Sequence, residues 1–493
     1  MVFSSLYFLF VFLFLNLIIY YLLPNIQWKN ALLLVFSLVF YAFAGPKFLL
    51  ILIGEVFISW IFTMLIGQTE DMGRAKLYLV VDLVLMLCLL CFFKYTNFVV
   101  ENIQAVFKWP EEFTELVLPI GISFYTFQLI SYTADVYRGE VAAQRNFFKL
   151  LLYASLFHQC IAGPIVRYRT VADDIDNRKI RLHDISEGAV RFSVGLAKKA
   201  VLANTCASIL SDLIPSTAEQ LNTTPVLSLW LGALLFTLQL YLDFSAYSDM
   251  AIGMGRMAGF HYDENFNYPL MSGSITEFWR RWHISLGSFF RDYVYIPLGG
   301  NRVPFGRMIL NMFVVWALTG IWHGGSWNFL FWGLFHFAFL FIEKYFLLKV
   351  FDAMPKFLKW IQHIYAVTIV VIGFVIFNQD TLPCLGAYLK GMFFGFGRAF
   401  ANIQTKSSFF GNIFFLVIAI ISCFPIYKTL RGKLVRSSRI SEGEIVTEEL
   451  VAVKSRRQMI LTVIDIITMV FCLLMSIIAL VGDSYNPFLY FRF

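Results

Sequence analysis

The feature that most constrains this chain is a succession of apolar segments, each long enough to cross a lipid bilayer or to tilt through it. They lie at residues 6–23, 31–44, 48–67, 77–93, 147–161, 190–210, 227–241, 329–342, 364–377, 409–427 and 461–481, with another apolar helix starting at Met308. A bilayer core about 30 Å thick needs roughly 20 helical residues. The pattern therefore predicts an all-α polytopic membrane protein with roughly 11–12 transmembrane helices plus re-entrant segments.

The composition supports this class and excludes others. Of 493 residues, 59% are hydrophobic and 14% are charged, which no ordinary soluble domain matches. The net charge of +7 is concentrated in a few loops, as expected for loops that face anionic membrane lipids, so we expect no nucleic-acid partner. The seven cysteines lack the spacing of a zinc site. We therefore expect no bound metal.

Charge also predicts the topology of a single membrane domain. Two Lys- and Arg-rich loops, at residues 167–191 and 428–458, are expected in the cytoplasm, and the N-terminus is expected outside. We divide the domain into N-terminal spans (1–115), a catalytic core (116–342), C-terminal spans (343–481) and an extracytoplasmic tail (482–493). Pro119 and Gly121 interrupt one apolar run that is rich in Ser, Thr and Gln. This run is expected to be a helix that faces protein, because its polar groups need partners.

The chemistry-bearing residues concentrate between Thr276 and Trp327. Two histidines, His283 and His323, lie there among arginines and tryptophans, although polar groups at membrane depth are costly. The i, i+3, i+4 spacing of Trp279, Trp282 and His283 predicts one shared helical face.

Neutral imidazole can take a proton from a hydroxyl and return it to a leaving group, so we predict catalytic work for both histidines. The glycines beside His323, from Gly320 to Gly325, allow another backbone to approach closely. The alternative is a histidine packed and hydrogen-bonded in the core. For His158 that alternative is favoured, with catalysis as the second possibility. Asp243 and Asp249 are expected either to pair functionally within the membrane or to cap a helix.

Five arginines near the histidines or in the first basic loop are candidates for binding an anionic cofactor, because guanidinium groups match phosphate geometry. Alternatively, each extends to the membrane surface. The candidates are Arg167, Arg169, Arg280, Arg281 and Arg291.

Five sequence blocks resemble the membrane-bound O-acyltransferase family, and within it the bacterial branch of membrane subunits for alginate and peptidoglycan O-acetylation. The blocks are CIAGPIVRY from Cys160, YLDFSAYSDMAIG from Tyr241, FWRRWHISLGSFFRDYVYIPLGG from Phe278, TGIWHGGSWNFLFWG from Thr319 and NPFLYFRF from Asn486. The chain departs from the family pattern at Ala246, where Gly is expected, and at Asn378, where Arg is common.

The resemblance implies a helical fold with a tunnel across the bacterial inner membrane. Acetyl-CoA would be the cytoplasmic acyl donor, used as a substrate with no bound cofactor, and a glycan outside the membrane the acceptor. An SGNH-like acetyltransferase partner would complete the transfer. Two other functions remain open: a lipid or protein acyltransferase of the same fold, and a transporter with proton-relay histidines.

The resemblance also implies site residues. His323 matches the signature histidine and is expected to be the general base, and His283 matches the second histidine, expected to orient the acyl group or stabilise the oxyanion. Phe488, Tyr490 and Phe493 resemble the FxYxxF ending of related acylation systems. Tyr490 is therefore expected to relay the acetyl group, and its alternative role is that of an interfacial aromatic anchor.

Overall fold

A computed structural model describes residues 2–108, 113–161, 163–438, 448–482 and 488. Every regular element among these residues is helical, and none is a strand, which confirms the predicted all-α class. Many helices start where the sequence offers a side-chain cap. Asn25 accepts a hydrogen bond from the N–H of Trp28, Asp71 from that of Gly73 and Ser274 from that of Glu277.

The elements follow one another along the chain without long irregular segments. The N-terminal part contains η1 (Phe8–Leu13), α1 (Phe14–Leu22), α2 (Ile26–Ala42), α3 (Pro46–Gln68) and α4 (Met72–Phe107). The central part contains α5 (Ile122–Tyr137), α6 (Phe147–Ser155), α7 (Tyr168–Asn177), α8 (Leu182–Ala197), η2 (Lys198–Ala203), α9 (Asn204–Leu213), α10 (Ala218–Thr223), α11 (Val226–Met257), η3 (Pro269–Met271), α12 (Ile275–Arg281), α13 (Ile284–Phe290), η4 (Arg291–Tyr295), α14 (Phe305–His323) and α15 (Trp327–Ile342). The C-terminal part contains η5 (Glu343–Leu347), α16 (Leu348–Ala353), η6 (Lys356–Leu358), α17 (Trp360–Asn378), α18 (Leu382–Phe393), α19 (Ile403–Gly411), α20 (Ile413–Ile421), α21 (Ile426–Ser438) and α22 (Glu448–Gly482).

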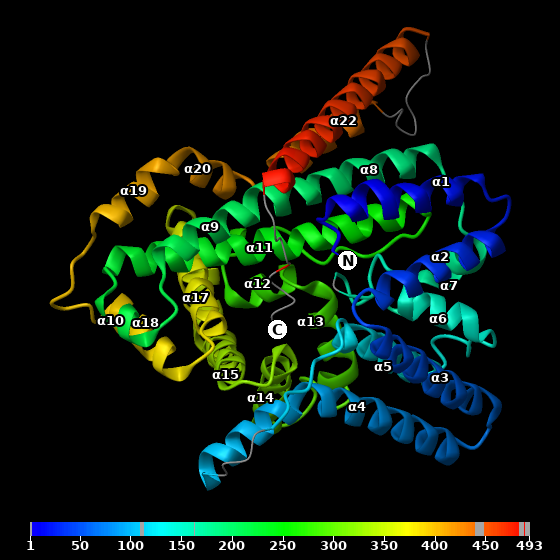
Figure 1. Ribbon diagram of the computed structural model, residues 1–493, viewed down its shortest axis with the longest axis horizontal. Coiled ribbons are helices and arrows are strands. Elements are labelled where there is room, and N and C mark those ends of the chain that lie inside the picture. The colour runs from blue at the N-terminus through cyan, green and yellow to red at the C-terminus, as the bar shows by residue number, and fades with distance from the viewer. Residues whose placement is uncertain (1, 109–112, 162, 439–447, 483–487, 489–493) are drawn as a thin grey trace.

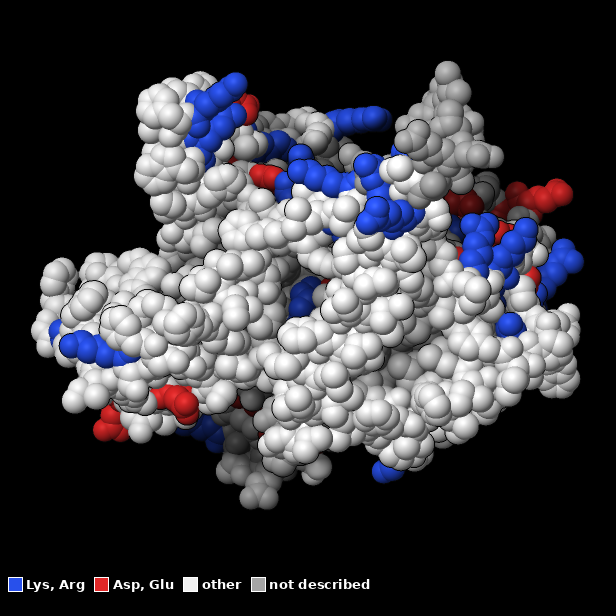
Figure 2. Space-filling model, turned by 90° about the horizontal axis from the view of Figure 1, so that it is seen from above, with Lys and Arg blue, Asp and Glu red and all other residues white. Residues whose placement is uncertain are grey.

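Six of the described helices are long and apolar enough to cross a membrane. They are α3, α4, α11, α14, α17 and α22. The pair α19 and α20, bent by 57°, is a seventh if the two helices form one broken span. On the face drawn in Figure 2, many charged side chains lie along the upper part and the right-hand side, above a broad belt of mostly uncharged side chains; a few more appear in a hollow near the centre and at the lower left. That belt is the surface expected to contact lipid.

The remaining predicted spans are shorter or interrupted. The expected span at residues 147–161 ends as a helix at Ser155, because the following backbone finds partners inside the protein. There the N–H of Phe157 donates to the hydroxyl of Ser37 over 3.1 Å. Irregular backbone at membrane depth is tolerated where protein supplies such bonds. The expected roughly 11–12 crossings are therefore not all long continuous helices.

Several boundaries differ from the prediction, among them the end of the fourth span and the second basic loop. Helix α4 does not end at Phe93 but continues to Phe107, since no Gly or Pro interrupts residues 94–107. Much of the predicted soluble loop 428–458 is also helical, apart from residues 439–447, which lie outside the described part. There α21 is held against α22 by an ion pair of 2.8 Å between Arg431 and Asp465.

The core forms where helices pack on α5 and α11. Helix α5 starts after Gly121, whose positive φ of 78° sets the turn into the helix. Nearly all residues of α5 are buried, as predicted from the polar residues in this run. Helices α8 and α11 touch through glycines, and a Cβ on Gly253 would lie 2.7 Å from the carbonyl oxygen of Gly188. The short helices α12 and α13 lie in the middle of the molecule (Figure 1), so the motif they carry is enclosed on its sides by longer helices.

Candidate active site

The first histidine, His283, lies in a break between α12 and α13. Helix α12 ends at Arg281, Trp282 is extended, and His283 has φ 44° and ψ 54°, in the left-handed region. The predicted helical face shared by Trp279, Trp282 and His283 is therefore wrong. A left-handed non-glycine residue costs about 1–2 kcal/mol, and the break persists because Asn265 bonds to the turn that follows: its carbonyl oxygen accepts the N–H of Ile284 over 2.9 Å.

The second histidine, His323, is the last residue of α14 and is buried among aromatic rings. Its ring lies 4.9 Å from that of Trp332 and 5.1 Å from that of Phe377, both edge to face. Its Nδ1 atom has no hydrogen-bond partner among the described residues. The approach predicted for Gly320 is confirmed, because a Cβ there would lie 2.4 Å from the carbonyl oxygen of Phe329 on α15. Helix α15 can thus pack directly against the turn that carries His323.

The two histidine rings both lie against the ring of Trp322. The ring of Trp322 lies 5.0 Å from that of His323 and 6.1 Å from that of His283. The Nε2 atom of His283 is also buried without a partner among the described residues. Each imidazole thus has one nitrogen atom without a hydrogen-bond partner among the described residues, and aromatic rings surround both. Such groups can exchange protons with a bound substrate while water is excluded.

A cavity of about 690 Å³ reaches His283 from one side. This volume is in the range of small-molecule sites. Apolar residues of α14 form much of its wall, among them Met312, Val315 and Trp316, whereas Arg280, Arg291 and Lys344 supply cations. The cavity can therefore hold a ligand that has both apolar and anionic parts, within reach of His283.

The five candidate arginines fall into two groups. Arg280 is exposed and lines the cavity, as does Arg291, whose side chain is 63% exposed. Arg291 also pairs with Asp292. The other three are ion-paired and do not line the cavity: Arg281 with Glu277, Arg169 with Glu140 and Arg167 with Asp292. Arg280 and Arg291 are therefore better placed to meet a ligand than the other three.

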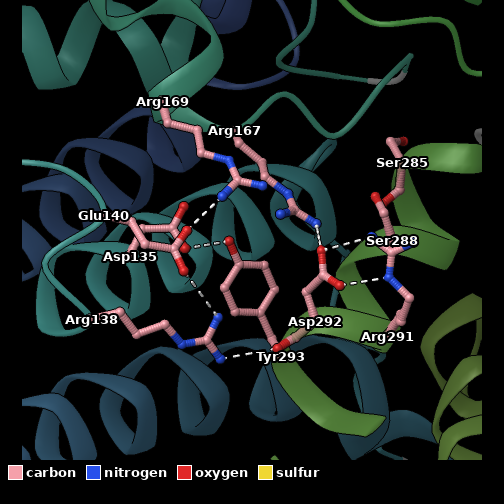
Figure 3. Close-up of polar contacts among 10 residues, drawn as sticks. All are labelled: Asp135, Arg138, Glu140, Arg167, Arg169, Ser285, Ser288, Arg291, Asp292 and Tyr293. Carbon is pink, nitrogen blue, oxygen red and sulfur yellow. Dashed lines mark hydrogen bonds and ion pairs between the residues drawn. The ribbon is translucent and has the colours of Figure 1, made fainter. Parts of the chain in front are cut away.

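Figure 3 shows Arg138, Arg167 and Arg169 around Asp292 and Tyr293 of η4. Arg167 donates to Asp292 over 2.7 Å, and Arg291 donates to the same carboxylate over 2.6 Å. Burial raises the pKa of Asp292, but the hydrogen bonds from Arg291 and Arg167 outweigh it and hold that pKa below its usual range. The guanidinium groups of Arg167 and Arg138 also stack on the ring of Tyr293, each 5.0 Å from its centre. The cluster fixes η4, and with it Arg291, beside the cavity.

The end of the chain is described only in part. Tyr490 and Phe493 lie outside the described residues. Phe488, the first residue of the FxYxxF ending, is buried, and its ring lies 4.7 Å from that of Tyr247 on α11. The ammonium group of Lys199 lies 4.8 Å from the centre of the Phe488 ring. This residue of the tail therefore sits inside the helix bundle instead of at its outer surface.

His158, Asp243 and Asp249, the other polar residues singled out in the sequence, each have a partner in the structure. His158 is buried, and its Nδ1 lies 3.4 Å from the hydroxyl of Tyr262, which agrees with a hydrogen-bonded core histidine. Asp243 forms an ion pair of 2.7 Å with Lys199, and Asp249 one of 2.7 Å with Lys198. Both aspartates lie inside α11, so they pair and do not cap a helix. No group of three or more potential metal ligands occurs among the described residues.

Several site residues were missed by the sequence analysis. Lys94 of α4 donates to the carbonyl oxygen of Trp322, at the end of α14. His336 of α15 accepts the indole N–H of Trp279 over 3.4 Å, and the carboxylate of Glu343 accepts the N–H groups of Ile275 and Thr276 at the start of α12. An ionisable residue in an apolar run is a signal that could have identified Lys94 and Glu343.

The long apolar helices define an integral membrane protein, and two buried histidines lie close to one tryptophan inside it. The sequence profile of "MBOAT, membrane-bound O-acyltransferase family" matches residues 141–382. The chain is 38% identical to the "Probable alginate O-acetylase AlgI" of Azotobacter vinelandii, over the full length of both proteins. It is 33% identical to the "Peptidoglycan O-acetyltransferase" of Helicobacter pylori, over 84% of this chain and 83% of that protein.

A "Teichoic acid D-alanyltransferase" of Streptococcus thermophilus is 31% identical over 44% of this chain and 54% of its own length. The similarity to the first relative extends over the full length of both proteins. The chain belongs to the membrane-bound O-acyltransferase family, as its motifs predicted, and it is an acyltransferase.

Proposed function

We propose that this acyltransferase takes acetyl from cytoplasmic acetyl-CoA and moves it across the inner membrane for O-acetylation of a polysaccharide or peptidoglycan. The observation that carries the proposal is the cavity of about 690 Å³ that is lined by His283 together with Arg280 and Arg291. A thioester donor that carries phosphates suits a cavity in which guanidinium groups and an imidazole are both present. The acceptor class comes from the relatives named for alginate and peptidoglycan.

The donor's phosphates would lie against Arg280 and Arg291, the two candidate arginines that line the cavity. Arg280 is exposed, and Arg291 shares Asp292 with Arg167, so either guanidinium group can meet a phosphate without leaving a buried carboxylate alone. Arg167, Arg169 and Arg281 would then act through the clusters that they hold together.

The acid–base work is assigned to the buried histidines, with His323 as the general base. It would take the proton of the attacking hydroxyl and return a proton to the departing thiolate. The aromatic enclosure around it supports this role, because exclusion of water strengthens proton transfer to a positioned base.

Transfer to the outer side would proceed through Tyr490 and a partner. The phenol oxygen attacks the thioester carbonyl and loses its proton to a histidine, the C–S bond breaks, and the aryl ester then passes its acetyl group on. The buried position of Phe488 supports a tail that enters the bundle. An SGNH-like partner would deliver the acetyl group to the glycan.

The test uses membranes that contain the full-length protein and radiolabelled acetyl-CoA. Hydrolysis or transfer of the label, absent with His323→Ala, is the expected result. A preference for long-chain acyl-CoA would favour a lipid or protein acyltransferase instead. Movement of protons or solute without turnover of any acyl-CoA would favour a transporter. Mass spectrometry of co-purified proteins would identify the partner.

A further inference from the structure

Asn265 has a buried side chain whose amide orientation is fixed by its neighbours. Its Oδ1 accepts the backbone N–H of Ser285 over 3.2 Å, and that N–H can only donate. Its Nδ2 group donates to the carbonyl oxygen of Gly163 over 3.4 Å, which can only accept, and to the hydroxyl of Ser248 over 3.2 Å. The oxygen of the amide therefore faces Ser285, and its nitrogen faces away.

This orientation determines which nitrogen of His283 carries the proton. Nδ1 of His283 lies 3.2 Å from Asn265 Oδ1, an atom that only accepts. The nearby hydroxyl of Ser285 accepts the N–H of Ile165 over 2.9 Å and donates its own proton to the same Oδ1 over 2.8 Å. The hydroxyl of Ser285 also lies 3.4 Å from Nδ1, but its proton is used in the shorter bond of 2.8 Å to Oδ1, so Nδ1 is the donor to Asn265. Neutral His283 is the Nδ1–H tautomer, and its Nε2 atom carries a lone pair.

The backbone of Asn265 also constrains His283, through a hydrogen bond to the residue that follows it. His283 has a positive φ of 44°, and the carbonyl oxygen of Asn265 accepts the N–H of Ile284 immediately after it. The ring of His283 stands edge-on to Phe244, with ring centres 4.8 Å apart. Asn265 thus holds both the turn and the ring, and Nε2 stays buried without a partner among the described residues.

We propose that Asn265 is a positioning residue that keeps His283 as a proton acceptor at the acyl-donor cavity. A neutral ring whose Nε2 lacks a proton cannot donate to an oxyanion, so this assignment replaces the oxyanion role expected from the sequence. It rests on the proposed function. In the second transfer, from the relay tyrosine to the acceptor, the acceptor's hydroxyl proton passes to Nε2 as the new C–O bond forms, the aryl C–O bond of the ester breaks, and the phenolate leaves as a phenol with that proton.

An acyl group that is transferred twice, first to a relay and then to an acceptor, requires two deprotonations. His323 and His283 would provide one acceptor for each, and Asn265 would serve His283 as the orienting carboxylate serves histidine in hydrolase triads. In both cases the partner of Nδ1 selects the tautomer and stabilises the imidazolium that forms.

The experiment compares Asn265→Ala, Asn265→Asp and Asn311→Ala with the wild-type protein in detergent. Asn311 is the matched control, since it is a buried asparagine that bonds to the carbonyl oxygens of Leu298 and Gly300. Asn265→Ala should lower kcat for acetyl-CoA turnover by about 10-fold or more with KM nearly unchanged. Asn265→Asp should retain more activity and shift the acidic limb of its pH profile, because a carboxylate stabilises the imidazolium. Asn311→Ala should match the wild type.

A second readout does not depend on activity. The nitrogen NMR spectrum of protein labelled with 15N-histidine, assigned by difference from His283→Ala, should show a protonated Nδ1 and an unprotonated Nε2 at neutral pH. A protonated Nε2 would overturn the proposal, as would an Asn265→Ala variant with unchanged kcat and pH profile. If Asn265→Ala does not fold, the wild-type spectrum and Asn265→Asp decide. If the wild type turns over no acyl-CoA, the proposed function fails, and the spectrum still tests the tautomer.

Discussion

Gly320 of α14 and Gly333 of α15 face each other across the contact between their helices: a Cβ on Gly333 would lie 3.1 Å from the Cα of Gly320 and 2.3 Å from the carbonyl oxygen of Trp316. Neither position has room for a side chain, and the opposing atoms are backbone, which cannot move aside singly. The contact lies one turn before His323, so the two glycines set how closely α15 and its ring of Trp332 approach that histidine.

Gly320→Ala should therefore lower the free energy of unfolding of the purified protein by roughly 1–3 kcal/mol, as expected for an overpacked contact. It should also lower the melting temperature and the rate of acyl transfer. Gly306→Ala is the control in the same helix, because nothing lies within 4 Å of a Cβ there. Its stability should be unchanged or slightly higher. Equal melting temperatures for the two variants would contradict the packing argument.

His323→Ala should abolish acetyl transfer and leave the protein folded, because loss of an acid–base group typically costs about 100-fold or more in rate. Transfer of label from acetyl-CoA and gel filtration are the two measurements. His183, whose side chain is 65% exposed, provides the control substitution. Activity above about a tenth of the wild-type value would rule out the general-base role.

Charge reversal of Arg280 or Arg291 should raise KM for acetyl-CoA, and added salt should weaken the wild-type interaction in the same direction. Arg74→Glu is the control, since that side chain is 72% exposed and does not line the cavity. Substitution of Arg167 should instead lower stability, because it leaves Asp292 with one partner fewer. If KM is the same in all five arginine variants, the arginines only anchor the protein at the lipid surface.

The ion pairs of Asp292 predict a pH dependence of stability. The pKa of this carboxyl is lowered in the folded protein, so its contribution is fully present above the unfolded pKa of about 3.9 and is lost as the pH falls through the folded value. The melting temperature should therefore fall more steeply between pH 7 and pH 3 in the wild type than in Asp292→Asn. Parallel curves would show that the cluster does not stabilise the fold.

Tyr490→Phe should prevent transfer to the glycan but leave binding of the thioester intact, because only the nucleophilic oxygen is removed. Mass spectrometry of the C-terminal peptide from the wild type, quenched during turnover, should show an acetylated tyrosine. Tyr485→Phe offers a control tyrosine close by in the sequence. Normal glycan acetylation by Tyr490→Phe would mean that the tail is only an anchor and that the acceptor or the partner reaches the site directly.

Hydropathy predicted most helices because burial in lipid demands long apolar runs, and α3, α14 and α17 begin and end within a few residues of the predicted limits. The sequence also pointed to both histidines as the candidate site. It did not predict the break at Trp282, because the periodicity of the motif continues through it. The bonds that stabilise the break come from Asn265, a residue outside that motif, and only the tertiary structure shows them.

The same reasoning explains why Lys94 was overlooked: a lysine at the end of an apolar run is typical of a span boundary. Its ammonium group instead reaches the carbonyl oxygen of Trp322, and the neighbouring Tyr95 donates to that of Ile321 over 2.9 Å. These are the last carbonyl oxygens before His323, and helix α4 comes from a part of the chain that contains none of the family motifs. The position of His323, the proposed general base, is therefore fixed in part by contacts from the N-terminal quarter of the chain. Substitutions of Lys94 or Tyr95 are therefore expected to displace His323 and lower activity, although both residues lie outside the family motifs.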